Sequence, residues 1–258
     1  MPDPDDLFTD ARLRDALGAR PFRFEPQLGS TNDVARQWAI DGAPSGSVVL
    51  TEAQNTGRGR FGRIWSAPLG TALLMSMILR PRVTPDRLPR LTMVGAVAVA
   101  EILEPLAPGK VSLKWPNDVM LTNRKVAGVL PEAIWQGNTL SAVILGIGLN
   151  VRVDFTDTPL ADKAISLETV TDTLIDRAVL LNTLLHRIDY WSMRVDESVL
   201  LETWRAMLGT LGQRVTVYAA GAGITGQVAG VDDNGALILQ DDDGILHHLL
   251  AGEVTLRG

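Results

Sequence analysis

The sequence pattern changes at Gly212, and this change restricts how the chain can fold. From there on, short segments typical of β-strands follow one another closely, at 215–218, 224–231, 236–240 and 245–250. They are separated by glycine- and aspartate-rich turns at 221–223, 233–235 and 241–244. The series predicts a small all-β barrel, of a size that usually needs a neighbour for stability. We therefore expect two domains, residues 1–210 and residues 211–258.

Residues 1–210 combine two kinds of hydrophobic pattern. Helical patterns cover 9–18, 34–39, 91–103 and two stretches within 174–208. Strand patterns cover 47–52, 71–79, 111–115, 125–130 and 141–149. A polar turn around Thr122 and Asn123 is predicted to join the strands at 111–115 and 125–130. The patterns favour an α+β unit, in which helices pack against a sheet, ahead of the barrel.

The charge balance and the absence of cysteine exclude several classes of function. A net charge of −6 in 258 residues argues against a general nucleic-acid coat, since such proteins usually carry a basic surface. Without cysteine there are no disulfides, no thiolate nucleophile and no cysteine-ligated zinc. The apolar run 91–103 is too short to span a bilayer, and the N-terminus, with Asp3, Asp5 and Asp6, lacks a basic signal-peptide start. We expect a cytoplasmic protein with no membrane partner.

The most distinctive local motif runs from Gly57 to Arg63 and holds three glycines and three arginines in seven positions. Glycine lets backbone N–H groups approach a ligand closely, while arginine offers a permanent charge and a planar fork of donors that matches carboxylate and phosphate. The motif therefore predicts a loop that grasps an anion. A solvated turn or a short RNA-binding tract would have the same composition.

Polar groups suited to a small ligand lie ahead of this loop. Ser30, Thr31 and Asn32 offer two hydroxyls and an amide, and Gln54 can both donate and accept. The same three residues also fit an N-cap for the helix that follows them. Both uses are compatible, because a helix N-terminus can itself be a ligand site.

The block Lys114-Trp115-Pro116-Asn117-Asp118 places an ammonium, an aromatic face, an amide and a carboxylate around a proline-fixed turn. Asp118 is a candidate Mg²⁺ ligand, because Mg²⁺ usually takes one or two carboxylates together with substrate phosphates. A solvated Asx turn is the alternative. Only four of the 24 basic residues are lysines, so Lys114 and Lys125 are candidates for work that suits a compact ammonium. A lysine at a strand end is, however, more often simply solvated.

The apolar strand 141–149 ends in the sequence Gly146-Ile147-Gly148-Leu149-Asn150. Its glycines permit close approach of another group to the backbone, and Asn150 can cap or bind. It is not a dinucleotide-binding fingerprint, because the third glycine is missing and no helix obviously begins there.

The order of these motifs closely resembles that of the biotin protein ligase family, also called biotin–acetyl-CoA-carboxylase ligases. The resemblance covers about residues 25–258, and its most specific parts are the Gly/Arg loop and the Lys-Trp-Pro-Asn-Asp block. It departs at Pro131, where the family more often has an aliphatic residue, and at Ala251, where a small polar residue is usual. Because proline donates no hydrogen bond, Pro131 puts strand pairing at that point in doubt.

The resemblance implies a mixed, largely antiparallel sheet with packed helices, related to class II aminoacyl-tRNA synthetases, followed by an SH3-like β-barrel. It also implies an ATP-dependent ligase that uses Mg²⁺ and forms biotinyl-5′-AMP from biotin and ATP. The biotinyl group would then pass to a lysine of biotin carboxyl carrier protein or of another biotin-dependent carboxylase domain. Homodimers are common in the family, but the residues identify no interface.

The resemblance further implies roles for residues at matching positions. Catalytic roles are expected for Lys125, Arg58 and Lys114. Biotin is expected to contact Ser30, Thr31, Asn32, Gln54, Arg58, Gly59, Arg60 and Lys125. ATP and the adenylate are expected to contact Arg58, Arg60, Trp65, Lys114, Asn117 and Asn150. Asp118 is expected to hold Mg²⁺, and Arg63 to anchor the loop.

Three other interpretations stay open on the sequence alone. A lipoate ligase would perform the same acyl-adenylate chemistry on another cofactor. A nucleic-acid-binding module would use the arginines of the loop with Phe61 and Trp65 as stacking groups, although the acidic balance argues against it. Some members of the family double as repressors through an N-terminal winged helix. The roughly 25 residues before the first motif are too few for one, so we expect ligase activity without operator binding.

Overall fold

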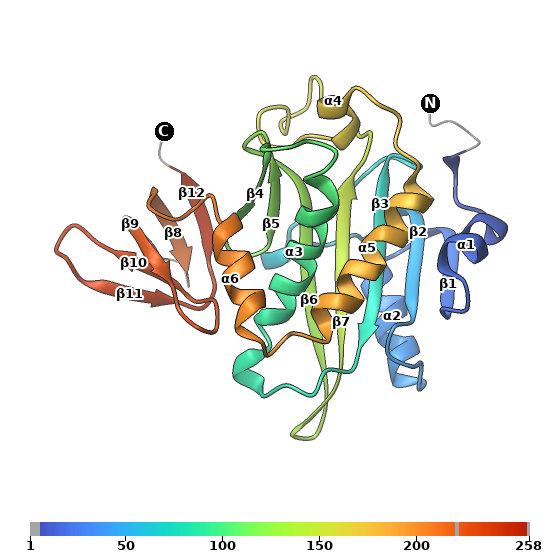
Figure 1. Cartoon of the computed structure of the whole chain (residues 1–258), viewed down its shortest axis with the longest axis horizontal. Helices are drawn as coiled ribbons and strands as arrows, with labels where there is room; N and C mark the ends of the chain where they lie inside the picture. Colours follow the sequence, from blue (N-terminus) through green and yellow to red (C-terminus); the bar gives the residue numbers. More distant parts are fainter. Residues whose placement is uncertain (1–5, 220–221, 257–258) are drawn as a thin grey trace.

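The computed structural model describes residues 6–219 and 222–256 (Figure 1). Asp3, Asp5 and the first residue of the predicted turn at 221–223 lie outside the described residues. The described strands form one sheet of seven strands and one of five, and the second sheet lies wholly in the C-terminal part of the chain. Figure 1 shows the smaller sheet at one side of the larger one.

The larger sheet is built from β1 Phe22–Leu28, β2 Val48–Gln54, β3 Ala72–Leu79, β4 Val111–Lys114, β5 Asp118–Leu121, β6 Arg124–Gln136 and β7 Thr139–Asn150. Their order across the sheet is β1-β2-β3-β7-β6-β5-β4. β1 and β2 are parallel, and the other described neighbours are antiparallel. The prediction of a mixed, largely antiparallel sheet is confirmed.

The helices that accompany the sheet are α1 Asp10–Leu17, α2 Thr31–Ile40, α3 Arg90–Leu103, α4 Leu167–Thr171, α5 Arg177–Ser192 and α6 Ser198–Met207. Figure 1 shows α3 and α5 in front of the sheet. Side chains alternate between the two faces of a strand. On β3, Met75 and Met77 join the core beneath α3, whereas Ile78 packs with Ala35 of α2. The sheet is therefore covered by α3 and α5 on one face and by α2 on the other.

The smaller sheet contains β8 Arg214–Ala219, β9 Ala222–Val231, β10 Leu237–Gln240, β11 Leu246–Leu249 and β12 Glu253–Leu256, in the order β11-β10-β9-β8-β12. It contacts the larger unit through the turn between β9 and β10. Trp115 Nε1 donates to the carbonyl of Gly235 at 2.9 Å, and Arg90 Nη2 donates to that of Asp233 at 2.9 Å. These bonds hold the small sheet against the large one. The division into domains at residue 210 stays a prediction.

One strand connection was predicted wrongly. The turn at Thr122 and Asn123, both with positive φ, joins β5 to β6 and not the segment 111–115 to 125–130. The four-residue strand β5 begins at Asp118, directly after the proline turn, and is too short to give a recognisable pattern. The helix α4 and the edge strand β1 were also missed; β1 is mostly exposed and contains Pro26.

The doubt about strand pairing at Pro131 is resolved. Pro131 pairs with Leu145 of β7 inside a continuous register, and the register shifts further along, between Ile134 and Trp135. The pairing of β5 with the other side of β6 ends at Gly128. A residue without an N–H is tolerated at a position that has a strand neighbour on one side.

Among the described residues, the helices are all too short or too polar to cross a membrane.

Candidate active site

A cavity of about 380 Å³ opens on the α2 side of the large sheet. This volume suits a small-molecule ligand. Its walls come from the start of α2, the Gly/Arg loop, the turn between β4 and β5, the strands β6 and β7, and residues 252–254 at the start of β12. The predicted site residues gather here: Ser30, Thr31, Asn32, Gln54, Arg58, Gly59, Arg60, Trp65, Lys114, Asn117, Asp118, Lys125 and Asn150 all line the cavity.

The cavity is strongly cationic although the chain is acidic. Two carboxylates among the described residues line it, Asp118 and Glu253, against six cationic side chains, those of Arg58, Arg60, Arg63, Lys114, Lys125 and Lys163. The chain as a whole has a net charge of −6. Such a local excess of positive charge in a concave site favours an anionic ligand.

At one end of the cavity, hydroxyl and amide groups form a recess. Thr31 donates to Gln54 Oε1 from its backbone nitrogen at 2.9 Å and from its hydroxyl at 3.3 Å. Asn32 Nδ2 donates to the carbonyl of Leu130 at 3.3 Å. Ser30 occupies the N-cap position of α2, but its hydroxyl makes no capping bond to any described residue. The side chains at the start of α2 therefore line the cavity, and the Ser30 hydroxyl does not cap the helix.

The sequence reasoning missed Ser76, which lies behind this recess. Ser76 is fully buried on β3, and its Oγ donates to Asn32 Oδ1 at 2.6 Å and lies 2.7 Å from the hydroxyl of Thr31. The signal that could have revealed it is a lone polar residue in the apolar strand Ala72–Leu79.

The glycines at the end of β7 leave room for two site residues. A Cβ at Gly146 would overlap Asn32, and a Cβ at Gly148 would lie 2.5 Å from Trp65 Cε2. A Cβ at Gly128, on the neighbouring strand β6, would lie 3.1 Å from Trp65 Cζ3. Asn32 and Trp65 can pack directly on the strands at these positions only because the glycines carry no side chain. The predicted close approach at the Gly146–Gly148 segment is thus observed.

The Gly/Arg loop folds back on itself over the cavity. Gly59 N donates to the carbonyl of Arg63 at 2.8 Å, and Trp65 N donates to that of Gly57 at 2.9 Å. Phe61 has a φ of 56° and Gly62 a φ of 72°, the left-handed region that a non-glycine residue adopts reluctantly. The loop is a compact turn whose arginines point in different directions.

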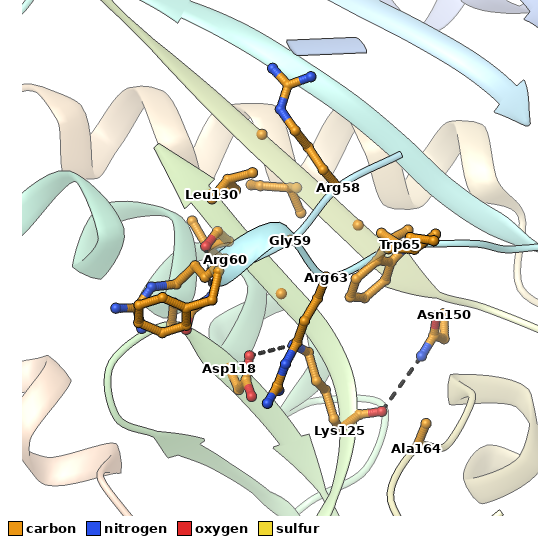
Figure 2. Close-up of a pocket in the computed structure, with 18 of the residues that line it drawn as sticks. Arg58, Gly59, Arg60, Arg63, Trp65, Asp118, Lys125, Leu130, Asn150 and Ala164 are labelled. Atoms are coloured by element: carbon orange, nitrogen blue, oxygen red, sulfur yellow. Dashed lines mark hydrogen bonds and ion pairs between the residues drawn. The ribbon is translucent and has the colours of Figure 1, made fainter. Parts of the chain in front are cut away.

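Arg58 extends away from the centre of the cavity. Its guanidinium donates to both carboxylate oxygens of Asp33, at 2.6 and 2.7 Å, and to those of Glu132 at 3.2 Å. Figure 2 shows Arg58 directed away from Asp118 and Lys125. The hydrogen bonds from Arg58 lower the pKa of Asp33. Arg58 thus fastens the loop to α2 and β6 in this structure, rather than pointing at the space where an anion would lie.

The other two loop arginines reach the small sheet. Arg63 pairs with Glu253 at the start of β12, and the hydrogen bond lowers the pKa of that carboxyl. Arg60 Nη1 donates to the carbonyl of Gly252 and to Asn117 Oδ1, each at 3.3 Å. Burial lowers the pKa of the Arg60 guanidinium. The observed pairing of Arg63 agrees with the anchoring role expected for it.

The charged centre of the cavity is formed by Lys125 and Asp118, whose Nζ and Oδ1 lie 2.5 Å apart (Figure 2). Lys125 Nζ also lies 5.4 Å from the centre of the Trp65 ring, within the range of a cation–π contact. Lys114 lines the same region, and burial lowers its pKa against the opposing effect of the Asp118 and Glu253 carboxylates. An ammonium, a carboxylate and an aromatic face therefore meet at one point.

Asn150 is buried, and its amide is used on the backbone. Its Nδ2 donates to the carbonyl of Ile165 at 3.3 Å and to that of Lys125 at 3.5 Å. Lys125 N in turn donates to the carbonyl of Lys163 at 2.8 Å. Asn150 thus connects β6 to the segment before α4, whose residues form another wall of the cavity.

Comparison with known families gives matches in both parts of the chain. Residues 24–150 match the Biotin/lipoate A/B protein ligase family, and residues 210–257 match the Biotin protein ligase C terminal domain. The first match, together with the fold, defines the class as that of the biotin and lipoate protein ligases. The second match points to the biotin branch of this class.

The names of individual relatives also point to the biotin branch of this class. The chain is 34% identical to the biotin–[acetyl-CoA-carboxylase] ligase of Mycobacterium tuberculosis, over 94% of this chain and 93% of that protein. It is 33% identical to the bifunctional ligase/repressor BirA of Bacillus subtilis, over 86% of this chain and 70% of that protein. A structure of biotin protein ligase from Aquifex aeolicus in complex with biotin and ATP matches with a TM-score of 0.78 and 29% identity, over 92% of this chain and 98% of that one. The chain belongs to the biotin protein ligase family.

Proposed function

We propose that the chain is an ATP-dependent ligase that activates biotin as biotinyl-5′-AMP and transfers the biotinyl group to a lysine of a biotin carboxyl carrier domain. The observation that carries this proposal is the cationic cavity of an acidic chain, with a recess of hydroxyls and amides at one end. A neutral polar head group fits the recess, and phosphates fit the cations. The similar ligase of Mycobacterium tuberculosis and the biotin and ATP complex from Aquifex aeolicus support the same substrates.

The reaction has two steps. First, an oxygen of the biotin carboxylate bonds to the α-phosphorus of ATP, the bond to the bridging oxygen breaks, and pyrophosphate leaves. Then the amine of the carrier lysine bonds to the acyl carbon, AMP leaves with the electron pair of the C–O bond, and the nitrogen loses a proton. Because the first step brings two anions together, the protein contributes mainly positioning and charge neutralisation.

The polar recess is the site that we assign to the ring of biotin. Ser30, Thr31, Asn32 and Gln54 supply its donors and acceptors. The valeryl chain would then run along β6 and β7, past Trp65, which itself packs directly on Gly128 and Gly148. This path leads from the recess to the charged centre, which places the carboxylate of biotin beside Lys125.

We assign charge neutralisation at the reacting groups to Lys125, with Lys114 and Arg60 near the phosphates. Gly59 and Asn117 offer backbone and amide groups next to these cations. Trp65 is assigned to the adenine side as a wall or stacking surface; its Nε1 is buried without a hydrogen-bond partner among the described residues. Asn150 is assigned an indirect role, because its amide holds the backbone carbonyls of Lys125 and Ile165.

The residues of the cavity fit a Mg²⁺ ion that takes few of its ligands from the protein and the others from the substrate and water. No cluster of three or more His, Asp or Glu side chains that could hold a metal occurs among the described residues. A single carboxylate is enough when substrate phosphates and water complete the coordination of Mg²⁺. Asp118 is the carboxylate that would hold the ion, which would neutralise phosphate charge.

Loss of the Arg58 side chain should loosen the loop. Arg58→Ala removes the bonds to Asp33 and Glu132, so we expect weaker biotin binding and faster escape of biotinyl-5′-AMP, by about tenfold each. Asp33→Asn should show part of the same effect. Filter retention of the labelled adenylate and calorimetric titration with biotin measure the two quantities. Arg23→Ala is the matched control, since Arg23 stacks on Trp38 outside the cavity. Wild-type retention and affinity in Arg58→Ala would refute the role.

One assay tests the proposed activity and separates it from the lipoate alternative. The protein is incubated with ATP, Mg²⁺, a biotin carboxyl carrier domain and either biotin or lipoate, and the mass of the carrier is followed. We expect a single biotinyl addition at the carrier lysine and no lipoyl addition. A carrier that gains lipoyl but not biotinyl mass would assign the chain to the lipoate branch. No transfer of either group would contradict the ligase function.

A further inference from the structure

The hydroxyl of Ser76 lies at the centre of a hydrogen-bond network just behind the polar recess. Its strand is otherwise apolar, and the side chain is fully buried without lining the cavity. Burying a hydroxyl among apolar groups is unfavourable unless the hydroxyl is hydrogen-bonded. Among the described residues, Ser76 meets this condition through two residues of the recess, Thr31 at 2.7 Å and Asn32 at 2.6 Å.

The backbone fixes the orientation of the Asn32 amide. The carbonyl of Leu130 can only accept, so the Nδ2 of Asn32 faces it, at 3.3 Å. The Oδ1 of Asn32 must then face Ser76, and this oxygen also can only accept. A hydroxyl carries one proton, so Ser76 directs it at Asn32 Oδ1, at 2.6 Å, and the Ser76 oxygen can accept from Thr31 across the 2.7 Å contact between the two hydroxyls. The missing side chain of Gly146, which pairs with Ser76 across the sheet, leaves the space that Asn32 fills.

The backbone also fixes the orientation of Gln54. The N–H of Thr31 can only donate, so Gln54 turns its Oε1 toward it, at 2.9 Å. The Thr31 hydroxyl lies 3.3 Å from the same oxygen and 2.7 Å from Ser76 Oγ, and it places its proton on one of these two acceptors. With its proton used on Ser76 or Gln54, Thr31 has only lone-pair capacity left for a ligand in the recess.

We infer that Ser76 is a positioning residue that holds Thr31 and Asn32 so that the recess presents an acceptor to an N–H group of the ligand. This inference rests on the proposed function. The cyclic urea of biotin carries two N–H groups, whereas the dithiolane ring of lipoate carries none. A recess that is left with an unpaired acceptor disfavours a ligand without a donor. Ser76 thereby contributes to the choice between the two cofactors without touching either.

Ser76→Ala tests the inference in the full chain. Removing the hydroxyl leaves Asn32 Oδ1 without its donor and Thr31 Oγ1 without its hydroxyl partner, so we expect the Kd for biotin to rise about tenfold. Desthiobiotin keeps the cyclic urea and should lose affinity by the same factor. The KM for biotin should rise in parallel, while kcat and the KM for ATP should stay within about twofold. Ser76→Cys keeps a weak donor and should give an intermediate Kd, which also serves if the alanine variant does not fold.

Ser47→Ala is the matched control. Ser47 is also fully buried, but its hydroxyl has no hydrogen-bond partner in the part of the chain that the structure describes. We expect its biotin affinity to equal that of the wild type. Unchanged biotin affinity in both Ser76 variants would overturn the inference, as would a fall in kcat and a change in the KM for ATP as large as the change for biotin. A wild-type protein that fails to bind biotin in the same titration would instead contradict the proposed function.

Discussion

Replacing Lys125 with alanine should slow biotin-dependent pyrophosphate release by about 10²- to 10³-fold. The ammonium lies 2.5 Å from Asp118 at the charged centre of the cavity, where the carboxylate of biotin and the α-phosphate of ATP must meet. Without it, two anions approach each other with one fewer cation between them. Coupled detection of pyrophosphate at saturating biotin and ATP measures the rate.

Two controls separate chemistry from folding in this experiment. Lys110→Ala removes an exposed lysine outside the cavity and should leave the rate unchanged. Thermal unfolding of Lys125→Ala should stay close to that of the wild type, since the side chain is about one-third exposed, at 32%. A rate within about threefold of the wild type would exclude the assigned role.

Replacing Arg177 with alanine should lower the free energy of unfolding by about 3–5 kcal/mol. Arg177 is completely buried and donates to Glu52 Oε2 at 2.6 Å, to the carbonyl of Ala72 at 3.0 Å and to Asp6 Oδ2 at 2.8 Å. Its removal leaves the buried carboxylate of Glu52 without a counter-charge. Urea denaturation followed by tryptophan fluorescence measures the loss.

A double variant tests whether the unpaired charge is the cause. Glu52→Gln with Arg177→Met removes both charges and keeps the acceptor for Phe8 N, which lies 2.5 Å from Glu52 Oε1. We expect it to recover much of the stability that the single variant loses. Arg214→Ala, which breaks an exposed pair with Asp242, should cost less than about 1 kcal/mol. A similar loss in Arg214→Ala and Arg177→Ala would contradict this account of the buried pair.

Long elements with a clear hydrophobic pattern could be predicted from the sequence. The helix predicted at 91–103 is α3 Arg90–Leu103, and the strand predicted at 141–149 is β7 Thr139–Asn150. Their patterns are strong because these elements are buried over most of their length. The four-residue strand β5 and the five-residue helix α4 gave no usable pattern. Contacts with the rest of the fold, and not local preference, stabilise such short segments.

The candidate site, like the fold, could be predicted from the sequence only in part. Glycine, arginine and lysine in unusual local concentrations showed where ligand contacts gather, and the structure brings those residues into one cavity. The partners of the loop arginines could not be predicted. Asp33, Glu132 and Glu253 lie on α2, β6 and β12, and they meet the loop only after the chain has folded. The sequence signal for Ser76 was weak, because a single serine in an apolar strand has many ordinary explanations.

The glycines of β7 make the two ends of the cavity separately adjustable. One added methyl group at Gly146 would displace Asn32 and so alter the ring-binding end, while one at Gly148 would displace Trp65 and alter the opposite end. The two positions are two residues apart on the same strand, so neither change needs a new loop or a new helix. Ligases that accept altered cofactors, or altered nucleotides, can therefore be sought by varying these two positions independently.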